Sequence, residues 1–384
     1  MSALTLSGAS GRVTGLEPLP HQTNTMVVNL GPQHPATHGV LQIVLGIDGE
    51  RVTSATPHIG FLHRNHEKIE ESRSYEQVIP YLDRMDYVSG LQNELAYVLA
   101  VESLSGIDVP DRAKYIRTAL FELNRVISHL VWLGTYLLDL GAITPFLYAF
   151  RDREKALDII ERTCGARMLP NYFTFGGLRR DIHPQFWHDL VDFCAYFENI
   201  LPEYEALTIE APVFKARTQG VGLMSKELAI NHGISGPNLR ASGVNHDLRK
   251  DQPYDAYPYL EFEVISRDEG DAWARSKVRF DEFYQSLNLI RQCAYKAPRT
   301  GAIKGKGRVK IDEGQQIYRS VEGSRGQLGV YLMSDGGAGP YRIKHRSPSF
   351  VVLQTIPDLF IGQKFADVIA ILGSVDVVLG EVDR

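Results

Sequence analysis

The sequence predicts an α+β fold in which a central helical bundle is combined with N- and C-terminal β-strands. Short alternating apolar runs occupy residues 26–60, helical periodicity dominates residues 65–300, and a mixed α/β pattern fills residues 305–384. With 384 residues, of which 44% are apolar and 23% charged, the chain can bury one large core. We therefore expect an N-terminal extension over residues 1–25 and a single domain over residues 26–384.

The N-terminal part of the domain reads as two hairpins. Strands are expected at 26–30, 40–47 and 51–56, and the pair Asp48-Gly49 suits a tight turn between the last two. The extension before them is rich in Ser, Gly and Thr, and it lacks the apolar centre of a secretion signal.

Helices follow at 67–79, 85–103, 111–140, 150–168, 185–201 and 271–293. The longest carries apolar residues at helical spacing and stops at Gly141. Its stripe consists of Ile116, Leu120, Leu123, Ile127, Leu130, Leu133 and Leu137. We expect this helix to form the centre of the bundle.

Two later regions depart from the helical pattern. Residues 235–259, dense in Gly, Pro, Tyr and charge, predict an ordered loop with internal ion pairs. Beyond them we expect strands at 309–311, 329–333, 341–345 and 350–353, a helix at 365–372 and an apolar stretch at 375–379. Strands at both ends of the chain suggest that its two termini lie near the same sheet region.

Composition excludes several classes of function. A net charge of −5 and a pI near 6.2 argue against a nucleic-acid binder. The sequence contains no uninterrupted run of about 18 apolar residues, which is the length that a helix needs to span a bilayer. The three cysteines, Cys164, Cys194 and Cys293, form no Cys-x-x-Cys pair, and three thiolates cannot hold a four-thiolate iron–sulfur or zinc site. Any metal redox centre must belong to a partner chain, so we expect no metal site and no iron–sulfur cluster here.

The loop Gly-Pro-Gln-His-Pro-Ala-Thr-His-Gly at 31–39 joins two predicted strands and carries His34 and His38. Imidazole titrates near neutral pH, so this hairpin tip is a candidate for proton handling or ligand binding. The alternative is a surface turn whose histidines are incidental.

Two further residues have chemistry that their positions do not explain. Asp139 lies in the last turn of the long helix among leucines, where the helix dipole and desolvation both disfavour a carboxylate. A cationic partner, of which an imidazolium is the natural one, would remove that cost; otherwise Asp139 points to solvent. Tyr87 follows Asp-Arg-Met-Asp at 83–86, and its phenol is either a hydrogen-bond and proton donor or a packed core residue.

Several segments of the chain resemble one protein family. They are residues 31–40, Gly-Phe-Leu-His-Arg at 60–64, Asp-Arg-Met-Asp-Tyr at 83–87, Ser-His-Leu-Val-Trp-Leu-Gly at 128–134, Asn-Tyr-Phe at 171–173, Arg-Ala-Ser-Gly at 240–243 and Gly-Glu-Val-Asp-Arg at 380–384. They resemble the 49 kDa subunits of respiratory complex I, the NADH–quinone oxidoreductase, which are related to the large subunits of nickel–iron hydrogenases. The resemblance runs from about residue 26 to the last residue and implies a hydrogenase-large-subunit-like fold.

The hydrogenase relationship suggests what happened to the metal site. Two Cys-x-x-Cys pairs hold the nickel–iron centre of hydrogenases, and here they fall on Asp86 and Ser89 and on Val378 and Glu381. None of these four residues is a cysteine, so a soft metal would find no thiolate ligand at these positions. The resemblance therefore implies a vacated cavity that accepts a quinone headgroup.

The family also implies roles for individual residues. His38 and Tyr87 would hydrogen-bond the two quinone carbonyls, and Asp139 would pair with His38. The pocket would be lined by His34, Val40, Leu41, Thr135, Asp376 and Val378, while Arg64, Arg84 and Ser89 would lie near a 4Fe-4S cluster in the adjacent subunit.

The implied activity is that of the quinone-binding subunit of a proton-pumping NADH:quinone oxidoreductase, active only within the complex. Its expected partners are the terminal iron–sulfur subunit (B), the 30 kDa subunit (C), the ferredoxin-like subunit (I) and the membrane heel subunits (H and A), on the cytoplasmic side of the inner membrane. Many family members carry a histidine where this chain has Leu169-Pro170. The protonation-linked cluster potential associated with that histidine is therefore not expected, and the quinone species stays open between ubiquinone and menaquinone.

Three alternatives remain at this point. A nickel–iron hydrogenase would need the missing thiolates, and a pure scaffold would not need His38, Tyr87 and Asp139 together. A relative that takes electrons from ferredoxin rather than NADH would bind its electron donor on another chain.

Overall fold

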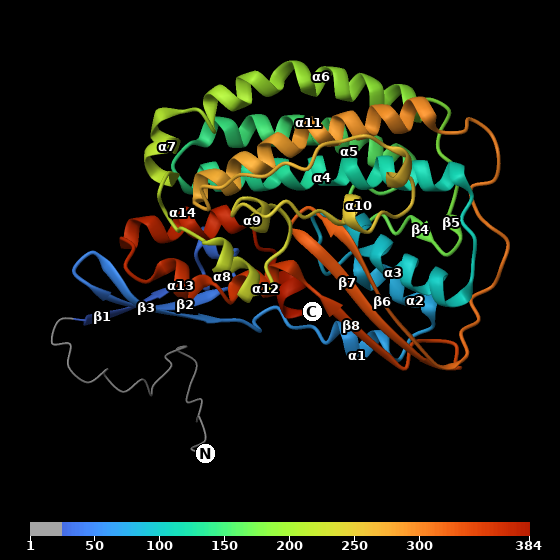
Figure 1. Ribbon diagram of the computed structural model, residues 1–384, viewed down its shortest axis with the longest axis horizontal. Helices are drawn as coiled ribbons and strands as arrows, with labels where there is room; N and C mark the ends of the chain where they lie inside the picture. The colour runs from blue at the N-terminus through green and yellow to red at the C-terminus, as the bar shows by residue number, and fades with distance from the viewer. Residues whose placement is uncertain (1–24) are drawn as a thin grey trace.

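The computed structural model describes residues 25–384 and confirms the α+β fold. Figure 1 shows a layer of long helices above two small sheets, with short helices between them. The predicted extension, apart from Thr25, lies outside the described residues. The boundary between that extension and the domain stays a prediction.

Four long helices form the upper layer, and α4 packs against α5, α11 and, through α11, α6. All seven residues of the apolar stripe predicted on α4 are buried. The bundle consists of α4 (Asp111–Asp139), α5 (Ile143–Cys164), α6 (Phe186–Leu207) and α11 (Ala272–Lys296). Periodicity therefore located the core of the bundle correctly.

The N-terminal sheet is an antiparallel meander in the order β1-β2-β3. Its strands are β1 (Thr25–Leu30), β2 (Gln42–Asp48) and β3 (Arg51–His58). Asp48 pairs with Arg51 across the tight turn, and Gly49 adopts a φ of 59° there, which glycine accepts without strain. The β1–β2 connection holds the short 3-10 turn η1 (Pro35–Thr37).

The C-terminal sheet is a second antiparallel meander, in the order β6-β7-β8. Its strands are β6 (Glu313–Gly323), β7 (Gly326–Asp335) and β8 (Arg342–Arg346). Two expectations were wrong: residues 309–311 are irregular, and residues 350–353 belong to helix α12 (Pro348–Leu353). Ser347 caps that helix by accepting from the Phe350 N–H, and Pro348 occupies its first turn, so local capping outweighed the β-branched residues.

The two sheets do not join, so the expected common sheet region was wrong in that respect. The end of the chain nevertheless reaches the residues that follow β3. The Asp383 carboxylate accepts from the Gly60 and Leu62 N–H groups at 2.8 and 2.7 Å. In Figure 1 the C-terminus accordingly lies between the two sheets.

The first predicted helix, 67–79, is split into α1 (His66–Glu70) and α2 (Tyr75–Leu82), because a capping box formed by Ser74 and Gln77 starts a new helix. The next, α3 (Gly90–Ser105), begins later than the expected residue 85. The Asp86 carboxylate accepts from the Val88 and Ser89 N–H groups and holds residues 86–89 in a turn. That turn carries Tyr87.

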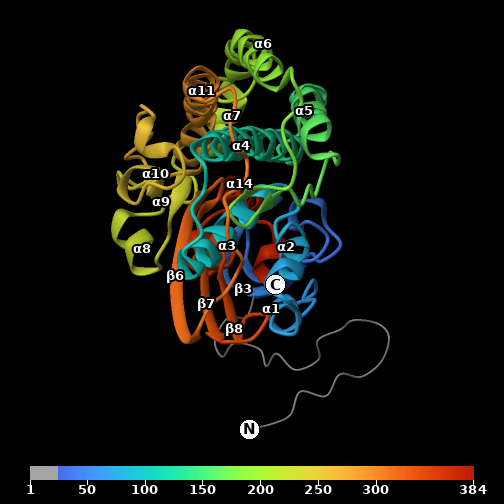
Figure 2. The same ribbon diagram turned by 90° about the vertical axis from the view of Figure 1, so that its right-hand side faces the viewer.

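The remaining elements are short. They are β4 (Phe173–Thr174), β5 (Gly177–Leu178), α7 (Pro212–Thr218), α8 (Lys226–Asn231), α9 (Gly236–Arg240), α10 (Leu248–Asp251), the 3-10 turn η2 (Tyr257–Tyr259), α13 (Ile356–Phe360), α14 (Phe365–Val375) and α15 (Leu379–Asp383). Residues 235–259 form the ordered, ion-paired region that was expected, with Asp247 bonded to both Arg240 and Arg249. Figure 2 shows α2 and α3 beside the C-terminal sheet and beneath α4. Among residues 25–384, no helix combines the length and apolarity that crossing a membrane requires.

Candidate functional site

The hairpin tip between β1 and β2 is fixed by its own hydrogen bonds. The Nδ1 atom of His34 accepts from the Ala36 N–H at 3.1 Å, and the Thr37 hydroxyl donates to the His34 carbonyl at 2.9 Å. His38 follows in the left-handed region, with a φ of 55°. Gly31 allows the close approach behind the tip, because a Cβ atom there would lie 2.2 Å from the Leu41 carbonyl oxygen. The two imidazoles are therefore presented by a rigid turn.

This tip packs against α4 and α14, which brings His34 to the end of the long helix. Burial raises the pKa of the Asp139 carboxyl, and the nearby His34 imidazole opposes the rise. No ion pair joins Asp139 to His38 among the described residues, and the expected pairing of the two stays a prediction. The imidazole that acts on Asp139 is His34, while the carboxylate that acts on His38 is Asp376.

Tyr87 projects from the turn before α3, and 36% of its surface is exposed in the isolated chain. The C-terminal helix α15 crosses close behind it at Gly380. A Cβ atom at that position would lie 2.4 Å from the Met85 carbonyl oxygen and 3.3 Å from the Tyr87 ring. Only glycine lets these two segments approach so closely.

A buried arginine, Arg325, lies at the centre of this region. Its Nη1 atom donates to the Asp86 carboxylate at 2.6 Å and to the Ser89 hydroxyl at 3.1 Å, and its Nε atom lies 3.3 Å from the Asp376 carboxylate. Burial alone would lower its pKa, but Asp376, Asp86 and Glu381 outweigh burial and raise it. Arg325 is therefore a permanent cation inside the protein.

The four positions that hold thiolates in hydrogenases do come together. Asp86 and Ser89 bind Arg325, while Ser349 accepts from the Val378 N–H and donates its own N–H to the Glu381 carboxylate, each at 3.1 Å. Burial and the nearby Asp86 raise the pKa of Glu381 to about 7.

These residues do not fit a metal. Among residues 25–384 no group of three or more His, Cys, Asp or Glu side chains could hold a metal ion, and a guanidinium in their midst repels a cation. The Arg325 side chain lies beside Asp86 and Ser89, two of the four positions to which the resemblance assigns the lost thiolates. The space beside the Tyr87 ring within this chain measures only about 20 Å³, roughly the room of one water molecule.

The positive charge of Arg325 acts on the pKa of both His38 and Tyr87. Burial lowers the pKa of His38, Asp376 raises it and Arg325 lowers it further, although part of the side chain stays exposed. Burial and Asp86 raise the pKa of Tyr87, and Arg325 and Arg64 oppose the rise. At neutral pH these shifts favour a neutral imidazole and an un-ionised phenol, both of which carry a hydrogen that can be donated.

The other predicted residues are distributed around this centre. Leu41, Val378 and Asp376 are buried, Val40 and Thr135 are half-buried, and the Thr135 hydroxyl donates to the Val131 carbonyl of its own helix at 2.9 Å. The two exposed arginines lie together, since Arg64 donates to the Arg84 carbonyl at 2.6 Å. Ser89 is buried beside Arg325 rather than next to these two.

Sequence reasoning missed Arg325 altogether. It lies in the Gly-Ser-Arg-Gly connection at 323–326 between β6 and β7, a composition typical of a solvent-exposed hairpin turn. The only available signal was that a turn with two glycines allows close backbone approach.

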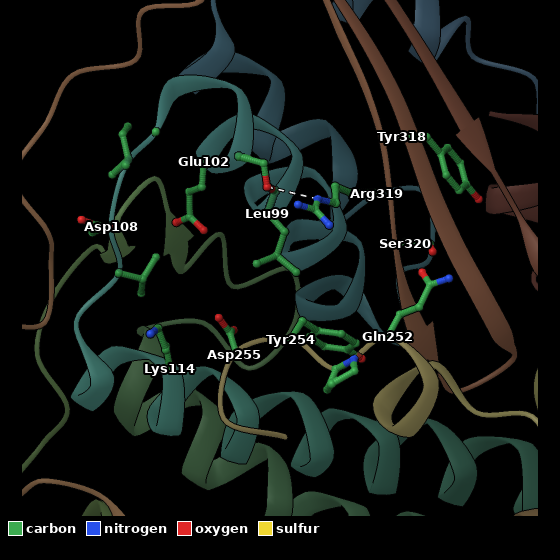
Figure 3. Close-up of a pocket in the computed structure, with 15 residues that line it drawn as sticks. Leu99, Glu102, Asp108, Lys114, Gln252, Tyr254, Asp255, Tyr318, Arg319 and Ser320 are labelled. Atoms are coloured by element: carbon green, nitrogen blue, oxygen red, sulfur yellow. Dashed lines mark hydrogen bonds between the residues drawn. The ribbon is translucent and has the colours of Figure 1, made fainter. Parts of the chain in front are cut away.

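A separate pocket of about 620 Å³ lies between α3, α4, residues 252–255 and β6. Figure 3 shows Glu102 and Asp255 reaching into it from opposite walls, with Ser103 bonded to Arg319 at its rim. Both carboxylates face the buried Arg117, at 2.6 and 3.7 Å. None of the predicted site residues lines this pocket.

Comparisons with known proteins agree with the motifs. The sequence model of the family described as "Respiratory-chain NADH dehydrogenase, 49 Kd subunit" matches residues 139–316 and 306–384. The D subunit of the NADH-quinone oxidoreductase of Geobacillus thermodenitrificans is 48% identical over 94% of this chain and 99% of that protein. The corresponding protein of Bacillus anthracis is 46% identical over the same shares.

A chain in the solved structure of the membrane-bound sulfane sulfur reductase, an archaeal respiratory membrane complex, has the same fold. The TM-score is 0.91 at 36% identity, covering 95% of this chain and all of that one. The chain therefore belongs to the family of 49 kDa subunits of the respiratory-chain NADH dehydrogenase.

Proposed function

We propose that this chain forms the site where quinone is reduced to quinol in an NADH:quinone oxidoreductase, with His38 and Tyr87 as the two groups that bind the quinone carbonyls. One observation carries the proposal: the buried Arg325 cation acts on both side chains, although they come from distant parts of the sequence. The proposal therefore assigns the two carbonyls to hydrogen donors that lie within the electrostatic range of one fixed positive charge.

The chemistry follows from how charge develops during reduction. Each carbonyl oxygen becomes more negative as electrons arrive, so donors and a cation aimed at it stabilise the reduced state more than the oxidised one. His38 would supply one proton from its protonated form, which the Asp376 charge favours and which takes up its proton from solvent, and Tyr87 would supply the other. A phenol with a raised pKa is a weak acid, but it suffices toward the strongly basic oxygen of a doubly reduced quinone.

The route of the electrons is also proposed. Arg64 and Arg84 form an exposed pair on the side of Tyr87, and a positive pair of this kind would raise the potential of a 4Fe-4S cluster held by an adjacent subunit. The relatives, named as components of an NADH-quinone oxidoreductase, support an assembly with its iron–sulfur, 30 kDa, ferredoxin-like and membrane heel subunits. The chain would be peripheral, on the cytoplasmic side of the inner membrane, and quinol formation would drive proton pumping in membrane subunits.

The test is Tyr87→Phe in the assembled complex. Removing one proton donor should lower NADH:quinone activity by about 10²-fold or more, while NADH oxidation by an artificial acceptor that bypasses the quinone site stays unchanged. Tyr295→Phe, at a tyrosine that is 87% exposed on α11, is the matched control and should leave both activities intact. Full quinone turnover in Tyr87→Phe would end the proposed role.

The similarity to a chain of a sulfane sulfur reductase favours a second candidate, reduction of a polysulfide by the same site. An assay of the purified complex with polysulfide and with a short-chain quinone separates the two. We expect turnover with the quinone alone.

A further inference from the structure

Two buried carboxyl groups lie side by side next to the turn that carries Tyr87. Asp83 and Glu94 are both fully buried and accept from backbone N–H groups of the adjoining residues 171–173, while Oδ1 of Asp83 has no hydrogen-bond partner among the described residues. Two buried carboxyl groups this close repel each other unless one of them keeps its proton and donates it to the other. A proton shared by the pair would give that Oδ1 atom a partner, and burial, which raises the pKa of both groups, favours it.

The same carboxyl groups clamp the backbone of a distant segment. Asp83 accepts from the Asn171 N–H at 2.8 Å, and Glu94 accepts from the Tyr172 and Phe173 N–H groups at 3.0 and 2.7 Å. Gly90 provides the room for this arrangement, because a Cβ atom there would lie 2.9 Å from the Asp83 carboxyl. The pair thus ties α2 and α3 to residues 171–173.

The segment held by Asp83 and Glu94 has a backbone conformation that needs contacts with the rest of the chain. Leu169 and Asn171 have φ values of 53° and 45°, and this left-handed region is sterically unfavourable for a leucine. Residues Met168, Leu169 and Pro170 then line the narrow space beside Tyr87, opposite Val88 and Leu91. Whatever holds residues 171–173 therefore also fixes one wall of the space beside Tyr87.

We propose that Asp83 and Glu94 are positioning residues for Tyr87, and that their shared proton keeps the wall formed by residues 168–173 closed against it. This inference rests on the proposed function of Tyr87. Asp83 belongs to the segment that leads directly into Tyr87, so the pair links the phenol's own turn to the facing wall. Loss of the shared proton would leave two adjacent buried carboxylates, whose repulsion would open the clamp.

The charged surroundings determine when this happens. Burial raises the pKa of both groups, and for Glu94 the neighbouring Asp83 raises it further. Arg84 from the Tyr87 turn and Arg179 after β5 oppose the rise for Asp83. On the α5 side the pair faces Cys164, a neutral thiol whose pKa is itself raised, with Arg180 beside it. The clamp is consequently closed while the pair keeps its proton, and it opens as the pH rises through the raised pKa of the pair.

The substitution Asp83→Asn removes the shared proton but keeps the hydrogen bonds of the pair. Asparagine can still accept from the Asn171 N–H, and its amide can donate permanently to Glu94, so the hydrogen bonds survive without a shared proton. In the assembled complex, assayed with decylubiquinone, we expect the alkaline limb of the wild-type pH–rate profile to move up by at least one pH unit. The KM at pH 7 should stay within twofold, and Asp158→Asn, an exposed carboxyl on α5, should leave the profile unchanged.

Asp83→Ala removes the clamp itself. We expect the KM for decylubiquinone to rise at least fivefold, and amide hydrogen exchange of residues 168–175 in the full chain to accelerate at least tenfold, while Asp83→Asn preserves protection. An unchanged alkaline limb in Asp83→Asn, or unchanged exchange in Asp83→Ala, overturns the inference. If the alanine variant does not accumulate, the pH–rate profile of the asparagine variant still tests the inference. Loss of turnover in Tyr87→Phe together with an unchanged Asp83→Asn profile would reject the clamp and leave the proposed function standing.

Discussion

Two clusters of buried arginines and carboxylates can be compared within this chain. One surrounds Glu122 and Arg249 between the bundle and β6, and the other surrounds Arg325 beside Tyr87 and His38. In the first, every oxygen of the Glu122 carboxylate accepts from a partner, including Arg125, Arg249 and Ser286. In the second, Oδ2 of Asp376 and Oε2 of Glu381 are buried with no hydrogen-bond partner among the described residues.

The difference extends to protonation. Burial would raise the pKa of Glu122, but Arg125 and Arg249 outweigh it and lower the pKa to about 2. For Glu381 burial and Asp86 prevail, and the pKa rises to about 7. A cluster whose central carboxylate is fully hydrogen-bonded and stays charged at every physiological pH serves stability, whereas a cluster with unpartnered carboxylate oxygens and a group that titrates near neutrality is typical of a functional site. The contrast can be tested by mutation.

The largest effect is expected from Glu122→Ala. It would leave Arg125 as a buried cation without its main partner and Arg249 with Asp247 as its remaining partner, and breaking a buried ion pair in this way costs about 3–5 kcal/mol. Urea denaturation of the full chain at pH 7 measures the loss. A change below about 1 kcal/mol would mean that water or Asp247 compensates, and the comparison would fail.

Glu381→Gln should have the opposite sign at alkaline pH. The folded-state pKa of about 7 lies above the ordinary value of 4.5, so ionised Glu381 costs folding free energy. This cost is absent below about pH 4, grows up to pH 7 and is complete above it, with an upper limit on the order of 3 kcal/mol. Urea midpoints should show the glutamine variant as more stable than wild type at pH 8 and equal to it at or below about pH 4. A variant that is less stable at pH 8 would show that the Glu381 carboxylate is well solvated or paired.

Asp376→Asn tests which carboxylate controls His38. Asp376 raises the pKa of His38, so removing its charge should lower that pKa further. The limb of the pH–rate profile for quinone turnover that reports His38 should move to lower pH, by about half a unit. Asp139→Asn is the matched control, because Asp139 acts on His34 instead and should leave this limb in place. The reverse result would support the pairing of Asp139 with His38 that the family resemblance implied.

The sequence predicted features that depend on neighbouring residues better than features that depend on residues far apart in the chain. The α4 stripe and the β1–β2–β3 meander follow from local periodicity, and both were located within a few residues. Residues 350–353 were misassigned because a Ser-Pro cap overrode a run of β-formers. Family motifs pointed to His38 and Tyr87 as candidates, but Arg325 could not be found, since Asp86 and Ser89 lie more than 200 residues away in the sequence and the turn that carries Arg325 resembles an exposed one.

The smallest effect is expected at a surface pair that resembles the buried ones in geometry alone. Arg167 and Glu154 are in contact at 2.7 Å, yet their side chains are 50% and 44% exposed. Solvent screens such a pair, so Arg167→Ala should change the free energy of unfolding by about 0.5 kcal/mol or less. Urea denaturation at low salt and at high salt checks both the size and the screening. Because Arg167 also borders the space beside Tyr87, a large salt-independent loss would indicate that it stabilises the 168–173 wall by packing rather than by charge.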